Sequence, residues 1–91
     1  MNKPLVSVFV LTYNAEKYIE ECLDSVISQT YDNLQIIVSD DLSSDNTRNI
    51  LIKYKEKYPQ IELYLQDINL GITGNCNFCL DKSKGEYYCF I

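Results

Sequence analysis

Hydroxyl, amide and acidic side chains gather just after two apolar runs of the chain, as Thr12-Tyr13-Asn14 and Asp40-Asp41. A tyrosine ring can stack on a nucleobase, and Thr or Asn can hydrogen-bond a base edge or cap a helix. Two adjacent carboxylates disfavour each other's charge, so they need hydrogen bonds or a cation nearby. One of them can accept from a base N–H, and the other from a ribose hydroxyl or a metal-bound water.

A third segment, from Asn69 to Asn75, contains Gly71 and opens a predicted helix. Glycine permits close backbone approach, and free N–H groups at a helix start favour phosphate. The segment is neither a Walker loop nor GxGxxG, so its spacing alone does not identify a nucleotide site. A purely structural role also stays open, in which Asn14 caps a helix, Tyr13 packs, and Asp40 or Asp41 caps the following turn through Ser43 and Ser44.

The pair Cys76 and Cys79 has redox or zinc-binding spacing, but the chain has no histidine and no second close pair. A four-ligand zinc site would require Cys22 and Cys89 to converge on this pair. Both cysteines match the apolar face of the predicted helix, where a free cysteine behaves as a small hydrophobe. We therefore expect reduced core cysteines and no metal ligands.

The composition indicates one small globular domain, with 91 residues, 46% apolar residues and a net charge of −5. An acidic chain without a Lys/Arg cluster is a poor nucleic-acid binder, because phosphate neutralisation supplies most of that affinity. No apolar run is long enough to span a bilayer. We expect a cytoplasmic location, with membrane association of a longer protein left open.

Four apolar runs alternate with stretches of helical spacing, which predicts βαβ units and a mostly parallel sheet. Right-handed crossovers favour a Rossmann-like, three-layer α/β/α fold with strand order 3-2-1-4. Ligands of such sheets bind at the carboxyl ends of the strands, where all three polar segments would gather. The predicted strands are 5–11, 34–39, 61–65 and 86–91, and the helices start near Asn14, near Ser44 or Asp45, and near Thr73; Pro59 and Gly85 end the second and third helices.

Landmarks along nearly the whole chain resemble those of family 2 glycosyltransferases, which have the GT-A fold. The run from Val6 to Asn14 resembles their opening strand, and the run from Ile36 to Thr47 their second strand and acidic turn. Further similar stretches are Glu20 to Val26 with Gln29-Thr30-Tyr31, Asn69-Leu70-Gly71, and Lys84 to Tyr88.

The resemblance implies sugar transfer from a nucleotide-diphosphate donor to an acceptor, in glycan or polysaccharide synthesis. It implies that Thr12 and Tyr13 contact the nucleobase, and that Asp40 hydrogen-bonds the base with Asp41 close by. The predicted nucleotide-binding residues are Thr12, Tyr13, Asn14, Asp40, Asp41, Asn69 and Gly71.

The family's DxD motif, which holds Mg²⁺ or Mn²⁺, is expected beyond Ile91, as are the catalytic base and the acceptor site. Residues 1–91 are thus predicted to be the N-terminal nucleotide-binding part of a GT-A domain, truncated before DxD and inactive alone. Two departures from the family pattern are Leu42, where many members have Gly, and Cys76-Asn77, where many have Arg-Asn. Without this Arg, the resemblance does not imply a direct cationic contact from this helix to the diphosphate.

Two other α/β classes fit less well. A sugar nucleotidyltransferase needs a Gly-rich loop with a basic residue after the first strand, and a nicotinamide-binding domain needs GxGxxG there. Thr12-Tyr13-Asn14 provides neither. The open alternative is a non-catalytic nucleotide-binding or interaction domain of the same fold. Strand 86–91 is expected to leave one edge unpaired and exposed, through which the chain would form a homodimer. The residues do not specify the sugar, nucleotide, acceptor or stereochemistry.

Overall fold

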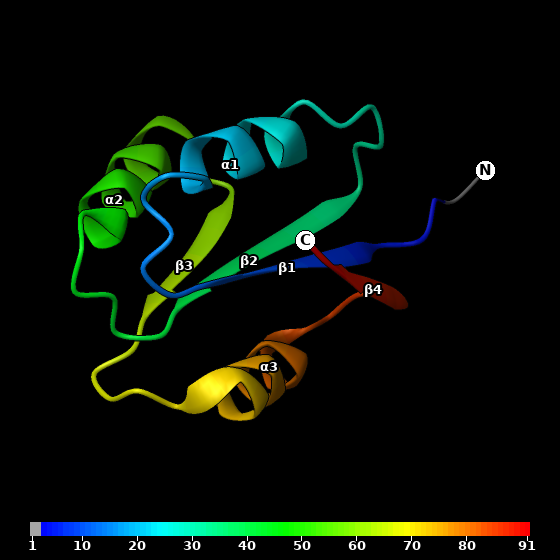
Figure 1. Ribbon diagram of the computed structural model, residues 1–91. Helices are drawn as coiled ribbons and strands as arrows, with labels where there is room; N and C mark the ends of the chain where they lie inside the picture. The colour runs from blue at the N-terminus through cyan, green and yellow to red at the C-terminus, as the bar shows by residue number, and fades with distance from the viewer. Residues whose placement is uncertain (1–2) are drawn as a thin grey trace.

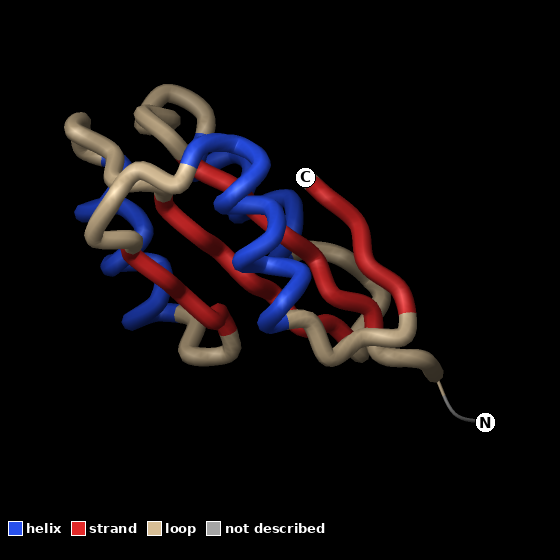
Figure 2. Tube along the Cα trace, turned by 90° about the horizontal axis from the view of Figure 1, so that it is seen from below, coloured by secondary structure: helices blue, strands red, loops and turns tan. Residues whose placement is uncertain are grey.

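A computed structural model describes residues 3–91 of the chain. Four parallel strands form one sheet in the order β3-β2-β1-β4, which confirms the predicted order. In Figure 2 the strands lie side by side, and the strand that leads to the C-terminus is at the outer edge. The elements are β1 (Val6–Thr12), α1 (Ile19–Ile27), β2 (Leu34–Asp40), α2 (Thr47–Lys57), β3 (Ile61–Leu65), α3 (Gly71–Lys82) and β4 (Tyr87–Phe90).

The direction of the crossovers explains why the molecule has three layers. The chain moves the same way along the sheet from β1 to β2 and from β2 to β3, so right-handed connections place α1 and α2 on one face. It then returns past β1 to form β4, which places α3 on the opposite face. Figure 1 shows this arrangement, with α1 and α2 on one side of the sheet and α3 on the other.

The main core lies between the sheet and the α1/α2 layer. Every second residue of β1 and β2 points to this face, including Val8, Val10, Ile36 and Val38. The helices contribute residues at helical spacing, as expected for one apolar stripe. The helical members of this cluster are Ile19, Leu23, Val26 and Leu51.

The face that α3 covers has a smaller core, made of Phe9, Ile37 and Cys79. Burial raises the pKa of Cys79 to about 11, so this thiol stays protonated at neutral pH, as the core interpretation requires. The expectation that both Cys76 and Cys79 lie in the core was partly wrong, because Cys76 is only half-buried. Asn75, four residues before Cys79, takes the place toward the sheet. All four cysteines are free.

The helix starts differ from the sequence prediction. Asn14 does not cap α1, because its φ of 50° turns the chain and α1 begins only at Ile19. The second helix begins at Thr47 rather than at Ser44 or Asp45. The third begins at Gly71 rather than near Thr73, and it ends at Lys82. None of the helices in residues 3–91 is long and apolar enough to cross a membrane.

Candidate functional site

A small pocket of about 120 Å³ opens at the carboxyl ends of β1 and β2, beside the start of α3. Three residues expected at a nucleotide site, Thr12, Tyr13 and Asp41, lie around it. Tyr13 is 57% exposed, so it is accessible from solvent at this pocket. The lining residues are Leu11, Thr12, Tyr13, Asp41, Ile72 and Asn75.

Asp40 lies behind this pocket and does not line it. Its side chain is fully buried, and its Oδ1 accepts from Thr12 Oγ1 at 2.6 Å and from Ser43 Oγ at 2.5 Å. Its Oδ2 accepts from the Ser43 amide and from Arg48 Nε at 2.8 Å. With four protein donors on two oxygens, Asp40 has no lone pair directed at a ligand. The geometry gives no support to the expected direct bond from Asp40 to a base.

The environment of Asp40 also keeps it ionised. Burial by itself would raise the pKa of this carboxyl group, because a charge loses hydration in the interior. The hydrogen bonds from Ser43, Thr12 and Arg48 outweigh burial and hold the pKa of Asp40 below its ordinary value. Asp40 is thus ionised at neutral pH and fixes the turn after β2.

Asp41 is the acid that reaches the pocket. Its Oδ1 accepts from the Leu70 amide at 2.6 Å, and its Oδ2 accepts from the Gly71 amide at 3.0 Å. A carboxylate has about four lone-pair positions, so two remain for a ligand N–H. The same contacts use two N–H groups that we expected to be free for phosphate. The start of α3 is therefore stabilised by the acid that directly follows β2, and it presents a negative charge at this point.

Asn75 completes the polar lining, and it was not among the predicted binding residues. Its Oδ1 accepts from Ser39 Oγ at 2.5 Å, and its Nδ2 donates to the Ser39 carbonyl at 3.1 Å. The second N–H of Nδ2 is left for a ligand. A signal was present in the sequence, since Asn75 follows Gly71 by four residues and so lies on the same helix face.

The other predicted residues build the walls. Asn14 Oδ1 accepts from the amides of Ser44 and Asp45, which ties the turn after β1 to the turn after β2. Asn69 Nδ2 donates to the Asp41 carbonyl at 3.1 Å. Gly71 has a φ of 77° and gives its amide to Asp41. The structure therefore brings all seven predicted residues to one edge, but only Thr12, Tyr13 and Asp41 line the pocket.

Arg48 was also missed as part of this region. It is the single arginine of the chain, and it lies one residue inside α2. Its Nε donates to Asp40, and a terminal nitrogen donates to the Gln66 carbonyl. Strand alternation could have indicated the contact, because Asp40 shares a face with the buried Ile36 and Val38.

A metal site does not fit the residues described here. Within residues 3–91 no three His, Cys, Asp or Glu side chains are close enough together to hold a metal ion. Near the pocket, four protein donors occupy the oxygens of Asp40. Asp41 is then the one carboxylate of the predicted pair that could still bind a metal. We therefore derive no chemical step through a metal bound to these residues.

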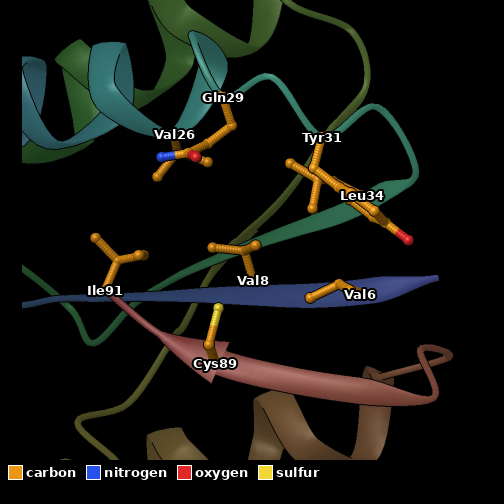
Figure 3. A pocket seen from close by; sticks show the side chains of 8 residues that line it. All are labelled: Val6, Val8, Val26, Gln29, Tyr31, Leu34, Cys89 and Ile91. Atoms are coloured by element: carbon orange, nitrogen blue, oxygen red, sulfur yellow. The ribbon is translucent and has the colours of Figure 1, made fainter. Parts of the chain in front are cut away.

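A larger pocket of about 240 Å³ lies away from the predicted site, on the α1 side of β1 and β4. Figure 3 shows apolar side chains of β1, Val6 and Val8, facing it beside Cys89 and Ile91, with Val26 across the space. Its lining has no carboxylate and no cation. Such a surface suits packing against another apolar surface better than recognition of a charged nucleotide.

Comparison with known proteins places these features in a family. The profile described as Glycosyl transferase family 2 matches residues 7–91. The putative teichuronic acid biosynthesis glycosyltransferase TuaG of Bacillus subtilis is 37% identical over 98% of this chain.

Two solved structures are also similar to this chain. One is the mannosyltransferase PcManGT from Pyrobaculum calidifontis in complex with GDP-Man and Mn²⁺, with a TM-score of 0.87 and 31% identity over 96% of this chain. The other is S. aureus TarS 1-349 in complex with UDP-GlcNAc, with a TM-score of 0.85 and 34% identity over 96% of this chain. The present chain spans 35% of TuaG and 26% of each solved chain.

Proposed function

The chain belongs to glycosyl transferase family 2, and from this membership we propose that it forms the nucleobase pocket of a sugar-nucleotide-dependent glycosyltransferase. The longer protein would transfer a sugar from a nucleotide-diphosphate donor to a glycan or polysaccharide acceptor. The observation that carries the proposal is the pocket where Tyr13, Asp41 and Asn75 meet at the strand ends. It matches the place where open α/β sheets bind their ligands.

Each polar lining group has a defined chemical use in this proposal. Asp41 has lone pairs left for a base N–H, and Asn75 has one N–H left for a base carbonyl. Uracil and guanine both present a ring N–H next to a carbonyl, so either edge suits this pair. The exposed Tyr13 ring can stack on the base, which is worth about 1–3 kcal/mol. Asp41 thus takes the base-binding role that the resemblance assigned to Asp40.

The diphosphate needs positive charge that this pocket does not supply. Its one carboxylate would repel phosphate, and Arg48 is engaged with Asp40 behind the pocket. A divalent metal would offset this charge, and we propose that its ligands lie outside the residues described here. We accordingly expect the 91-residue chain to show no sugar transfer with metal, donor and an acceptor panel.

Nucleotide titration tests the proposal on the chain as it stands. We expect uridine or guanosine diphosphate to bind with a dissociation constant of about 1 mM, or roughly −4 kcal/mol. Amide resonances of Tyr13, Asp41 and Asn75 should shift together in NMR spectra. The substitutions Tyr13→Ala and Asp41→Asn should each weaken binding about tenfold, as expected for the loss of one stacking or charge-assisted contact.

Two matched substitutions serve as controls. Tyr18→Ala removes another exposed tyrosine of the same segment, and Asp67→Asn removes an exposed acid near this edge, whereas Asp41 is buried. Neither residue lines the pocket, so neither change should alter the affinity. If Tyr13→Ala and Tyr18→Ala bound equally well, the base would lie elsewhere and the proposal would be wrong.

We also propose that the chain self-associates through β4. This strand pairs with β1 on one side, and Tyr87, Tyr88, Phe90 and Ile91 are all exposed. An exposed apolar edge strand is a template for another strand. A second copy of the chain would both pair this free edge and cover the exposed apolar side chains, since a two-fold axis would place identical edges against each other.

A further inference from the structure

Arg48 extends from the start of α2 to a position behind the candidate base pocket. Its side chain is 26% exposed, whereas that of Asp40 is fully buried. The guanidinium group makes two contacts in different directions, to the Asp40 carboxylate and to the Gln66 carbonyl. Neither Asp40 nor Gln66 lines the pocket, but each is bonded to residues that lead to it.

The first contact leads to the wall formed by Thr12. Asp40, held by Arg48 at 2.8 Å, accepts the hydroxyl proton of Thr12 at 2.6 Å. The Thr12 carbonyl in turn accepts from the Asp41 amide at 2.9 Å. Arg48 is therefore two hydrogen bonds from a pocket-lining hydroxyl and three from the backbone of the proposed base-binding acid.

The second contact leads to the wall formed by Asn75. The backbone amide of Gln66 donates to the Asp40 carbonyl at 3.0 Å, and its side-chain Nε2 donates to Ser39 Oγ at 3.0 Å. Ser39 Oγ donates to Asn75 Oδ1 at 2.5 Å, so it fixes which way the Asn75 amide faces. Residues 67–70 then lead from Gln66 to the Leu70 amide, which bonds Asp41.

We propose that Arg48 is a positioning residue of the base pocket, holding the Thr12 wall and the Asn75 wall at their working separation through Asp40 and Gln66. The inference rests on the proposed function for its purpose, but the contacts themselves do not depend on a ligand. Arginine suits this task because its planar fork directs several N–H groups at fixed angles. Lysine would keep the charge next to Asp40 but has a compact ammonium group and no fork.

The first test needs no nucleotide and uses amide hydrogen exchange of the 91-residue chain. In Arg48→Lys, the amides of Asp41, Leu70 and Gly71 should exchange about tenfold faster, relative to a core amide such as that of Val38. Arg48→Met should give a larger effect, and Arg48→Lys carries the test if the methionine variant does not fold. Lys53→Met, on an exposed position of the same helix, should leave all these rates unchanged.

The second test measures nucleotide affinity in the same variants. The dissociation constant for the better-bound of uridine and guanosine diphosphate should rise about tenfold in Arg48→Lys and stay constant in Lys53→Met. If the unmodified chain binds neither nucleotide, the proposed function fails, and the exchange pattern alone decides the role of Arg48. Equal acceleration of pocket and core amides would mean that Arg48 only stabilises the fold and would overturn the inference, as would unchanged exchange in Arg48→Lys.

Discussion

Asp40 and Asp41 are neighbours in sequence, but their side chains have opposite surroundings because successive residues of an extended chain point to opposite faces. Asp40 continues the face of Ile36 and Val38, where α2 brings Arg48 to it. Asp41 points to the other side, where α3 begins. The first acid therefore acts as a structural anion and the second as a ligand-facing one.

The structural role of Asp40 predicts a dependence of stability on pH. Its pKa in the folded chain lies below the ordinary value of 3.8, so the unfolded chain takes up the proton at a higher pH. The contribution of Asp40 is therefore complete above about pH 5 and is lost as the pH falls through the folded-state pKa. Asp40→Asn should unfold more easily at pH 7, by about 3 kcal/mol, because Arg48 loses its partner.

Urea unfolding between pH 7 and pH 2 separates this effect from that of other acids. The free energy of unfolding of Asp40→Asn should fall less steeply with acid than that of the unmodified chain. Some slope should remain, because the pKa of the half-buried Asp45 is also lowered. Loss of hydration raises this pKa, but the hydrogen bonds from Thr47 and from the Glu16 amide together outweigh that effect. Asp67→Asn should keep the full slope, and an equally steep slope in Asp40→Asn would contradict the assignment.

Leu42, directly after the two acids, gives a second prediction about a single residue. Its φ is 63°, a left-handed conformation that costs a residue with a Cβ atom about 1–2 kcal/mol. Leu42→Gly removes that strain, although the more flexible unfolded chain offsets part of the gain. We expect Leu42→Gly to be more stable than Leu42→Ala by about 1 kcal/mol in urea unfolding, and an alanine variant of equal or greater stability would contradict this.

The sequence predicted which residues would meet at the site but not how each would be used. Thr12, Tyr13 and Asp41 follow from topology, because parallel strands end at the same edge. The saturation of Asp40 depends on Ser43 and Arg48, whose contacts require the turn and α2 in three dimensions. No local pattern specifies such contacts.

The ends of the helices also depend on contacts in three dimensions that no local sequence pattern specifies. Asn14 has a good capping side chain, but its side-chain oxygen Oδ1 accepts from the amides of Ser44 and Asp45, about thirty residues away. The start of α3 is stabilised by Asp41 from the turn after β2, so the helix begins two residues before Thr73. Distant partners thus override local capping preferences, whereas the strands, which depend on apolar pattern, lie close to their predicted positions.

The connection from α3 to β4 requires close backbone approach at Gly85. A Cβ atom there would lie 2.7 Å from the Ser7 amide nitrogen and 2.8 Å from the Leu5 carbonyl oxygen. The Gly85 amide also donates to Ser7 Oγ at 3.0 Å. Gly85 therefore fixes β4 against β1, although we predicted it as a helix stop.

Gly85→Ala should destabilise the chain by about 2 kcal/mol or more, because backbone atoms must move to admit the methyl group. Thermal or urea unfolding measures this loss. Lys84→Ala is the matched control, since its side chain is exposed and only its backbone amide contacts Gln35. A Gly85→Ala variant as stable as Lys84→Ala would show that β4 is held more loosely than the structure indicates.

For the molecule as a whole, the layered architecture was predictable because it depends on few rules. Alternating strands and helices give a parallel sheet, and right-handed crossovers give its order and its layers. Its exposed edge was also expected, since β4 follows the last helix and pairs with β1 alone among residues 3–91. The apolar pocket beside this edge was not foreseen, because it depends on how far α1 extends over β1.

Self-association through β4 gives the last prediction. Tyr88 and Phe90 pack against Phe9, yet they remain 55% and 45% exposed, so apolar surface stays open beside an unpaired edge. We expect sedimentation equilibrium to show a dimer at micromolar concentration. Tyr87→Lys should shift it toward monomer, because a charged residue on an edge strand disfavours pairing with another strand.

Ile68→Lys supplies the comparison for that experiment, since it adds the same charge at an exposed apolar residue in the loop between β3 and α3. It should leave the association constant unchanged, and both variants should unfold like the unmodified chain. If Ile68→Lys weakened association as much as Tyr87→Lys, net charge rather than the β4 edge would control assembly. A monomer at every concentration would show that a four-residue strand is too short to recruit a second copy.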